Sequence, residues 1–221
     1  MYIFLLRKVN KFLLFIILGG PLAATKTYFS HKENMEIKVT IGTTSGCSDT
    51  VNFISNHLVE AYRLYGEFLD IEFVPWGRTQ WVNDVFTCQF REPDCWANRL
   101  HRCVLNMLKD NQDAQVHYMA CEFSSPFPSF TQGSYLCAQA VGVNLIDVDY
   151  CVAHPGDELD KKAKEAAEGP MQPDAINFVP YIVFNDVISR PVHDEARIRF
   201  ASMICFALAA DPSTGVTNCQ I

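Results

Sequence analysis

Residues 37–50, IKVTIGTTSGCSDT, decide the fold of this chain. Over Ile37–Thr43, β-branched apolar residues alternate with polar ones, and this pattern predicts a half-buried strand. The turn Thr44–Gly46 follows, and from Thr50 onward apolar residues recur at spacings of three and four, which predicts a helix. The sequence therefore predicts a strand, a turn and a helix in direct succession.

A single cysteine, Cys47, occupies the junction of this strand and helix, and Ser48 or Asp49 is the expected N-cap. Unpaired amide groups and the positive end of the helix dipole favour a thiolate there, and the thiolate is the reactive form. The carboxylate of Asp49 acts in the opposite direction. Two other interpretations stay open, because Cys47 can equally be a structural disulfide partner or an inert buried thiol.

Two later strands and a closing helix complete the predicted core. Leu69–Trp76 alternates like a strand, and Tyr181–Phe184 is a short apolar run bounded by a proline and a turn. Glu195–Ala210 has an apolar stripe at helical spacing. This order of elements predicts an α/β fold in which helices cover a sheet.

The segment between these two halves, about residues 83–177, holds six of the nine cysteines. Helices are predicted there over Trp96–Leu108, Gly133–Val141 and Asp157–Glu168. The last of these is strongly charged and is interpreted as a solvated helix face. The proline-rich stretch 124–128 is predicted to be a loop.

The composition is that of a folded protein, because 49% of the 221 residues are hydrophobic and 19% are charged. We expect a single domain over residues 36–221, with the cysteine-rich segment as an insertion. The formal net charge of -7 provides no basic stripe, so no nucleic-acid partner is expected.

The first 24 residues are predicted to be a signal peptide, because basic residues precede an apolar run over 12–18 and small residues over 19–24. An uncleaved membrane anchor is the alternative, although the apolar run is shorter than the roughly 20 residues that a spanning helix needs. In either case the rest of the chain reaches an oxidising lumen or the exterior. We expect no membrane partner after signal cleavage.

The number of cysteines is odd, and all nine follow this segment. They are Cys47, Cys88, Cys95, Cys103, Cys121, Cys137, Cys151, Cys205 and Cys219. In an oxidising compartment eight can form four disulfides and leave one free or paired between chains, and the sequence leaves the pairing open. Zinc is the competing use of cysteine, but no CxxC or HExxH spacing is present and no metal site is predicted.

The segment Cys88–Cys103, CQFREPDCWANRLHRC, has the spacing of a known family signature. That signature is CQHG, two residues, EC, two residues, N, four residues and C. It is typical of the gamma-interferon-inducible lysosomal thiol reductase (GILT) family. Phe90 and Arg91 replace His-Gly here, and Asp94 replaces Glu. Phe73–Gly77 and Phe178–Tyr181 resemble two further segments of that family, so the resemblance covers essentially the whole mature chain.

The resemblance implies a thioredoxin-like three-layer fold with a mainly helical insertion that disulfides stabilise. It also implies an enzyme that reduces or isomerises disulfides in disulfide-bonded or unfolded protein substrates, without a cofactor, in an endosomal or lysosomal lumen. The eight cysteines other than Cys47 are then structural. Because no N-x-S/T sequon is present, secretion is expected as readily as lysosomal delivery.

The chain departs from the family at the active site, where Thr50 stands in place of the second cysteine of a CxxC. Without that thiol, we expect Cys47 to form a mixed disulfide that an external thiol such as glutathione or cysteine must resolve. The Thr50 hydroxyl either donates a hydrogen bond to the Cys47 thiolate or only caps the helix. The alternative to an enzyme is a catalytically lapsed lumenal or secreted binding protein, or holdase, on the same fold.

By resemblance, Pro180 is expected to be cis and to face Cys47, with the backbone of Val179 pairing with an extended substrate. An ordinary trans proline at the start of an edge strand is the other interpretation of the residues alone.

Overall fold

The structure is a computed structural model and describes residues 36–219. The predicted signal peptide, residues 1–24, lies outside the described residues. Within residues 36–219, every helix is too short or too polar to cross a bilayer.

The described residues form one three-stranded sheet in the order β2–β1–β5. Its strands are β1 (Ile37–Thr43), β2 (Leu69–Pro75) and β5 (Tyr181–Phe184). The central strand β1 runs parallel to β2, with Thr43 opposite Pro75, and antiparallel to β5. The three strands predicted from the sequence are therefore confirmed, with β2 ending one residue early.

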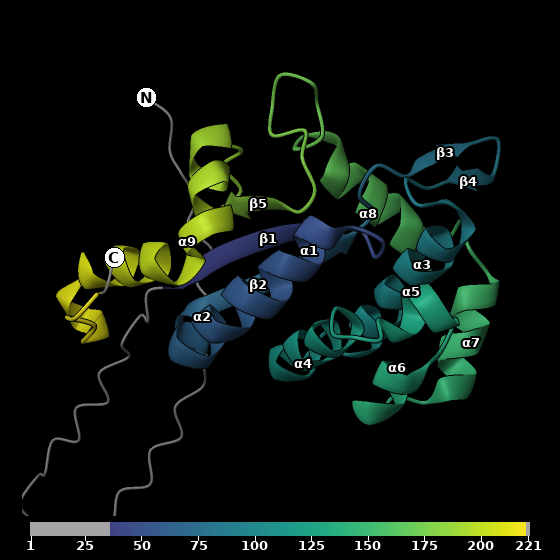
Figure 1. The fold of residues 1–221 in the computed structure, drawn as a ribbon, viewed down its shortest axis with the longest axis horizontal. Coiled ribbons are helices and arrows are strands. Elements are labelled where there is room, and N and C mark those ends of the chain that lie inside the picture. The colour runs from purple at the N-terminus through teal and green to yellow at the C-terminus, as the bar shows by residue number, and fades with distance from the viewer. Residues whose placement is uncertain (1–35, 220–221) are drawn as a thin grey trace, which may run out of the picture. The chain divides into compact units, whose positions relative to one another are not determined.

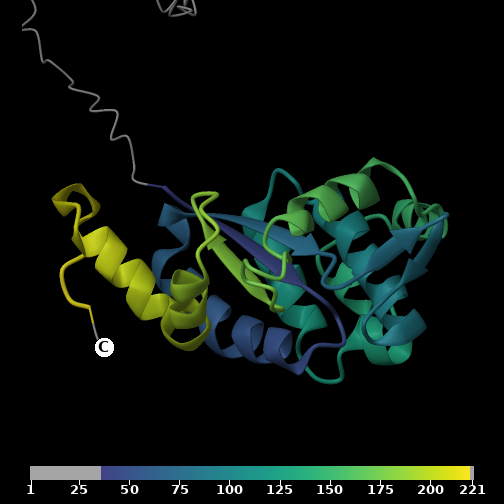
Figure 2. The same ribbon diagram turned by 90° about the horizontal axis from the view of Figure 1, so that it is seen from above.

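A continuous helical stretch follows β1 and consists of α1 (Ser48–Phe53), the π-helical segment η1 (Ile54–Leu58) and α2 (Val59–Tyr65). The closing helix α9 (Arg190–Ala209) begins five residues earlier than predicted and is kinked at Arg199, whose φ is -140° and ψ 48°. In Figures 1 and 2, α1, α2 and α9 lie on one side of the sheet and α8 lies on the other.

The chain between β2 and β5 begins with a hairpin that the sequence analysis missed. Its strands are β3 (Gln80–Val82) and β4 (Val85–Thr87), and they pair antiparallel. Asn83 and Asp84 join them with φ of 50° and 61°. Left-handed conformations at both central residues are typical of a type I′ hairpin turn, in which asparagine and aspartate are common.

Helices make up most of the remaining segment. They are α3 (Arg91–Met107), α4 (Gln112–Glu122), α5 (Pro128–Gln132), α6 (Leu136–Ala140), α7 (Leu145–Ala153) and α8 (Glu158–Glu168). Two short 3-10 helices, η2 (Gly66–Phe68) and η3 (Pro212–Thr214), lie outside this segment. The sequence analysis predicted α3 and α8 but neither α4 nor α7. The helix expected over 133–141 is shorter, because Gly133 has a φ of 59° and ends α5.

The core explains why β1 is the central strand. Val39 and Ile41 are fully buried and belong to one apolar cluster with Phe53 on α1 and Leu100 on α3. Because Val39 and Ile41 lie on the same face of β1, a slip by one residue would remove both from this cluster, and the strand is therefore held firmly in register. The end of β1 is therefore a rigid place for a reactive side chain.

Candidate active site

Cys47 lies at the end of β1 and is the N-cap residue of α1, with an extended backbone (φ -90°, ψ 119°). Its amide donates to the Thr44 carbonyl at 3.2 Å, and its own carbonyl accepts from the Val51 amide at 3.1 Å. The expectation that Ser48 or Asp49 is the N-cap is wrong, because α1 already begins at Ser48. Cys47 is therefore even closer to the helix N-terminus than the sequence predicted.

The side chain of Cys47 is 7% exposed and contacts the segment before β5. Its Sγ donates to the Val179 carbonyl at 3.5 Å, and the Val179–Pro180 peptide bond is cis, as the resemblance implied. Residues 132 positions apart in sequence thus meet at the sulfur. This contact joins three of the predicted site residues in one place.

Thr50, the fourth predicted site residue, is fully buried in the first turn of α1. Among the described residues its hydroxyl oxygen has no hydrogen-bond partner. The structure therefore contains neither the expected hydrogen bond to Cys47 nor a capping hydrogen bond from Thr50.

Two side chains of α3, Asp94 and Asn98, hold the turn that leads to Cys47. The Asp94 carboxylate accepts from the Thr44 hydroxyl at 2.9 and 3.0 Å, from the Ser45 hydroxyl at 2.7 Å and from the Gly46 amide at 3.2 Å. Asn98 accepts from the Ser45 amide at 2.9 Å and donates to the Thr44 hydroxyl oxygen at 2.9 Å. The sequence analysis recognised both residues as parts of a signature but assigned neither a role.

An aromatic ring covers this turn on its outer side. A Cβ added to Gly46 would lie 2.5–2.7 Å from atoms of the Phe90 side chain, so glycine is the residue that fits. The Phe90 ring also meets the Phe130 ring edge to face, with 6.5 Å between centroids. The place of the family's histidine is thus taken by an apolar ring next to the active-site turn.

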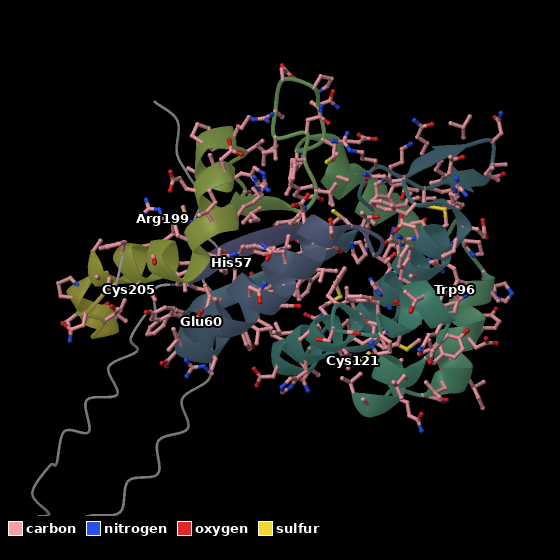
Figure 3. All side chains as sticks on the ribbon, in the orientation of Figure 1. His57, Glu60, Trp96, Cys121, Arg199 and Cys205 are labelled. Carbon is pink, nitrogen blue, oxygen red and sulfur yellow. A yellow bond between two sulfur atoms is a disulfide. The ribbon has the colours of Figure 1, made fainter. Side chains whose placement is uncertain are left out.

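The structure pairs every cysteine except Cys47. The disulfides are Cys88–Cys95, Cys103–Cys151, Cys121–Cys137 and Cys205–Cys219. The first joins the chain before α3 to the start of that helix, the second joins α3 to α7, and the third joins α4 to α6. The fourth joins α9 to the chain after it; Figure 3 labels Cys121 on α4 and Cys205 on α9. Cys47 is accordingly the one free thiol among residues 36–219.

The charged helix α8 is not simply a solvated face, and this interpretation is corrected. Asp160 is fully buried and accepts from Arg99 at 3.1 Å and from Arg102 at 2.7 Å, while Asp157 pairs with Arg99 at 2.8 Å. Burial, opposed by Asp160, lowers the pKa of Arg102 to about 10. These ion pairs fasten α8 to α3, the helix that carries Asp94.

A buried histidine lies behind the proline segment. His193 on α9 accepts from the Ile182 amide through Nδ1 at 3.2 Å, and its ring lies 5.9 Å from that of Phe178. Burial, opposed by Asp194 and assisted by Arg197 and Arg190, lowers the pKa of His193 to about 4. His193 is therefore neutral at neutral pH.

The larger cavities lie away from the thiol. One of about 510 Å³ follows β2, and one of about 340 Å³ lies beside the Cys88–Cys95 disulfide; Cys47 lines neither. In residues 36–219, no group of three or more histidine, cysteine or acidic side chains is arranged to hold a metal ion.

The fold and this site define the class of protein. A free cysteine at the N-terminus of the helix after the central strand, lying against a cis-proline segment, is the arrangement of a thioredoxin-like thiol oxidoreductase. The fold is similar to that of DsbA from Chlamydia trachomatis, with a TM-score of 0.53 and 15% identity over 88% of this chain and 100% of that chain. The predicted thioredoxin-like fold is confirmed. Enzymes of this class exchange disulfides without a bound cofactor.

The sequence comparisons agree with the resemblance to the GILT family. Residues 38–141 match the family described as gamma interferon inducible lysosomal thiol reductase (GILT). The chain is 26% identical over 203 residues to GILT-like protein 1 of Drosophila melanogaster, covering 83% of this chain and 79% of that protein. It is 21% identical over 183 residues to the gamma-interferon-inducible lysosomal thiol reductase-like protein of Anopheles gambiae, covering 75% and 74%. The chain is thus similar to the GILT family, as its signature segment indicated, and Thr50 distinguishes it from the family pattern.

Proposed function

We propose that the protein is a monothiol oxidoreductase that reduces or isomerises protein disulfides through a mixed disulfide at Cys47. The observation that carries the proposal is the position of this free thiol, at a helix N-terminus and in contact with the cis-proline segment. Backbone N–H groups and the helix dipole favour the thiolate there. Thr50, buried where a second thiol would stand, has no chemistry that resolves a disulfide.

The reaction then needs two external thiols for each substrate disulfide. The Cys47 thiolate attacks one sulfur of the substrate disulfide, forms a mixed disulfide and releases the first substrate thiolate. An external thiolate attacks the Cys47 sulfur and releases the second substrate thiolate. A second external thiolate then restores the Cys47 thiolate and leaves as the oxidised external disulfide. In isomerisation, a thiol of the substrate itself takes the part of the external thiol.

We assign substrate binding to Val179 and Pro180. The carbonyl of Val179 lies 3.5 Å from the Cys47 sulfur, so an extended substrate chain bound along this segment would present its disulfide to Cys47. The partners are disulfide-bonded or unfolded proteins, and the place of action is the endosomal or lysosomal lumen or the exterior, reached through the signal peptide at residues 1–24. The domain is assigned to residues 36–221, with an insertion over about 83–177.

The test compares the wild type with Cys47→Ser and Thr50→Cys at pH 5 and pH 7. A disulfide-bonded protein substrate is mixed with each, with and without glutathione, and adducts are measured by mass spectrometry after acid quenching. We expect the wild type to accumulate a mixed disulfide that only added glutathione releases. Thr50→Cys should release the substrate without glutathione, because the second thiol is held beside the adduct.

Two results would contradict the proposal. If the wild type behaves like Cys47→Ser under all conditions, Cys47 does no chemistry, and the protein is better described as a lumenal binding protein or holdase. If only Thr50→Cys forms adducts, the natural protein is a lapsed enzyme.

A further inference from the structure

We propose that Asp94 and Asn98 are positioning residues for Cys47, because together they fix the three-residue turn that sets the cysteine at the N-terminus of α1. The inference rests on the proposed function, since it concerns the reactivity of the same thiol. Neither side chain contacts the Cys47 sulfur through a hydrogen bond, so neither is a catalytic residue.

The contacts of this pair reach every residue of the turn. Asp94 accepts from the side chains of Thr44 and Ser45 and from the amide of Gly46, and Asn98 accepts from the amide of Ser45. The two residues are also joined to each other, since Asn98 Nδ2 donates to the Asp94 carboxylate at 3.1 Å. Hydrogen bonds to the side chains and to the backbone of the turn together hold it in one conformation.

The burial of the charged Asp94 carboxylate depends on the conformation of the turn. The side chain is fully buried, and within residues 36–219 no lysine, arginine or histidine nitrogen lies within 4 Å of its carboxylate. Its negative charge is therefore compensated by hydrogen-bond donors instead of a cation, and the Phe90 amide at 3.2 Å completes the set. If the turn moves, the carboxylate loses the donors that make its burial possible.

The same contacts connect the reactive thiol to the cysteine-rich segment. Asp94 and Asn98 are one helical turn apart on α3, and Arg99 and Arg102 of that helix are fastened to α8 by the buried Asp160. The Cys88–Cys95 disulfide closes the start of α3 next to Asp94. The insertion thus provides a rigid support from which the two side chains hold the turn.

Cys47 depends on this support because the turn keeps its sulfur at the helix N-terminus, where backbone N–H groups favour a thiolate, and next to the segment before β5. Asp94→Asn puts an NH2 group among hydrogen-bond donors, and Asn98→Ala removes the acceptor of the Ser45 amide. Both changes should loosen the turn. Glu122→Gln is the matched control, because Glu122 is also a buried carboxylate that accepts from a backbone amide, that of Ser129 at 3.1 Å, but it does not contact the turn.

The experiment measures two quantities in the full oxidised protein at a temperature where all variants are folded. The first is hydrogen exchange of peptides that cover residues 44–47, and the second is the rate at which Cys47 reacts with 5,5′-dithiobis(2-nitrobenzoic acid) as a function of pH. We expect Asp94→Asn and Asn98→Ala to speed exchange in the turn and to slow the Cys47 reaction at least tenfold at pH 5. Glu122→Gln should stay within twofold of the wild type in both.

Unchanged Cys47 rates in folded Asp94→Asn and Asn98→Ala, or an equal effect of Glu122→Gln, would overturn the inference. If Asp94→Asn does not fold, Asn98→Ala decides it. Failure of the proposed function is a separate result: a wild type whose Cys47 reacts with the probe but never forms an adduct with a protein disulfide. If the wild-type thiol does not react with the probe at all, the exchange measurement alone decides the role of the pair.

Discussion

His193 should make the fold less stable as the pH falls from neutral towards the acidity of an endosome or lysosome. The residue is fully buried at the start of α9, where its Nδ1 accepts from the Ile182 amide and must be unprotonated to do so. The perturbation has two parts, a change of pH from 7.5 to 5 and the substitution His193→Asn, whose amide oxygen can accept the same hydrogen bond.

The magnitude follows from the two pKa values of His193. Burial lowers the pKa to about 4 in the folded protein, against 6.5 for an exposed histidine. Because the folded value is lower, the unfolded chain takes up the proton first. The stabilisation is fully present above pH 6.5 and is lost progressively as the pH falls towards 4. This linkage reduces the free energy of unfolding by about 2 kcal/mol at pH 5 and by about 3 kcal/mol below pH 4.

The charged groups around His193 support this direction. Arg197 and Arg190 oppose protonation, and the carboxylate of Asp194 favours it, with its Oδ1 3.9 Å from Nε2. The buried carboxyl group of Glu122 does not obscure the loss of stability between pH 7.5 and 5. Glu122 has its pKa lowered, because the His101 imidazole and Ser129 outweigh the effect of burial, so it stays ionised at pH 5.

The assay is urea unfolding of the oxidised wild type, His193→Asn and His117→Asn between pH 7.5 and 5. The exposed His117 is the control for losing a histidine. We expect the free energy of unfolding of the wild type, minus that of His193→Asn, to fall by about 2 kcal/mol between pH 7.5 and 5. This change does not depend on how far the two proteins differ in stability at pH 7.5. A difference that stays constant to within about 0.5 kcal/mol would refute the reasoning.

Three further predictions concern stability. Asp160→Asn should lower the free energy of unfolding by about 3–5 kcal/mol in urea titrations, because two buried guanidinium groups lose their shared carboxylate; a loss below about 1 kcal/mol would contradict this. Replacing the Cys103–Cys151 pair by serines should lower the free energy of unfolding by about 1 kcal/mol more than replacing Cys205–Cys219. The reason is that the first disulfide closes a loop of 48 residues and the second a loop of 14. The reverse order in thermal unfolding would be evidence against the loop argument. Gly46→Ala should cost about 1–3 kcal/mol, because its Cβ would meet the Cβ and the ring of Phe90. Phe90→Gly in the same chain, which removes all of these atoms, should restore part of the loss, and additive effects would exclude the clash.

Much of the fold was predictable because its signals are local. Alternating apolar residues predicted β1 and β2, a short apolar run predicted β5, and helical spacing predicted α3, α8 and most of α9. The missed helices are α4, which carries almost as many polar as apolar residues, and the short α5 and α7. The helical form of α4 and α7 depends on disulfides and packing more than on pattern, and Cys121–Cys137 and Cys103–Cys151 hold these two helices in place.

The sequence by itself determined the place of Cys47, at the end of a strand and the start of a helix, because strand, turn and helix are adjacent in the chain. It also determined that at least one cysteine has no disulfide partner within the chain, since the count is odd.

Only the tertiary structure decided which cysteines pair, that Val179 contacts the sulfur, and that Asp94 and Asn98 hold the turn. The same is true of Asp160, which in sequence belongs to a charged, apparently solvated helix but is buried between two arginines. Except for three of the disulfides, these contacts join residues about 50 to 130 positions apart. Local patterns carry no information about such distances, because long-range contacts depend on how whole elements pack and not on the residues next to each partner in the chain.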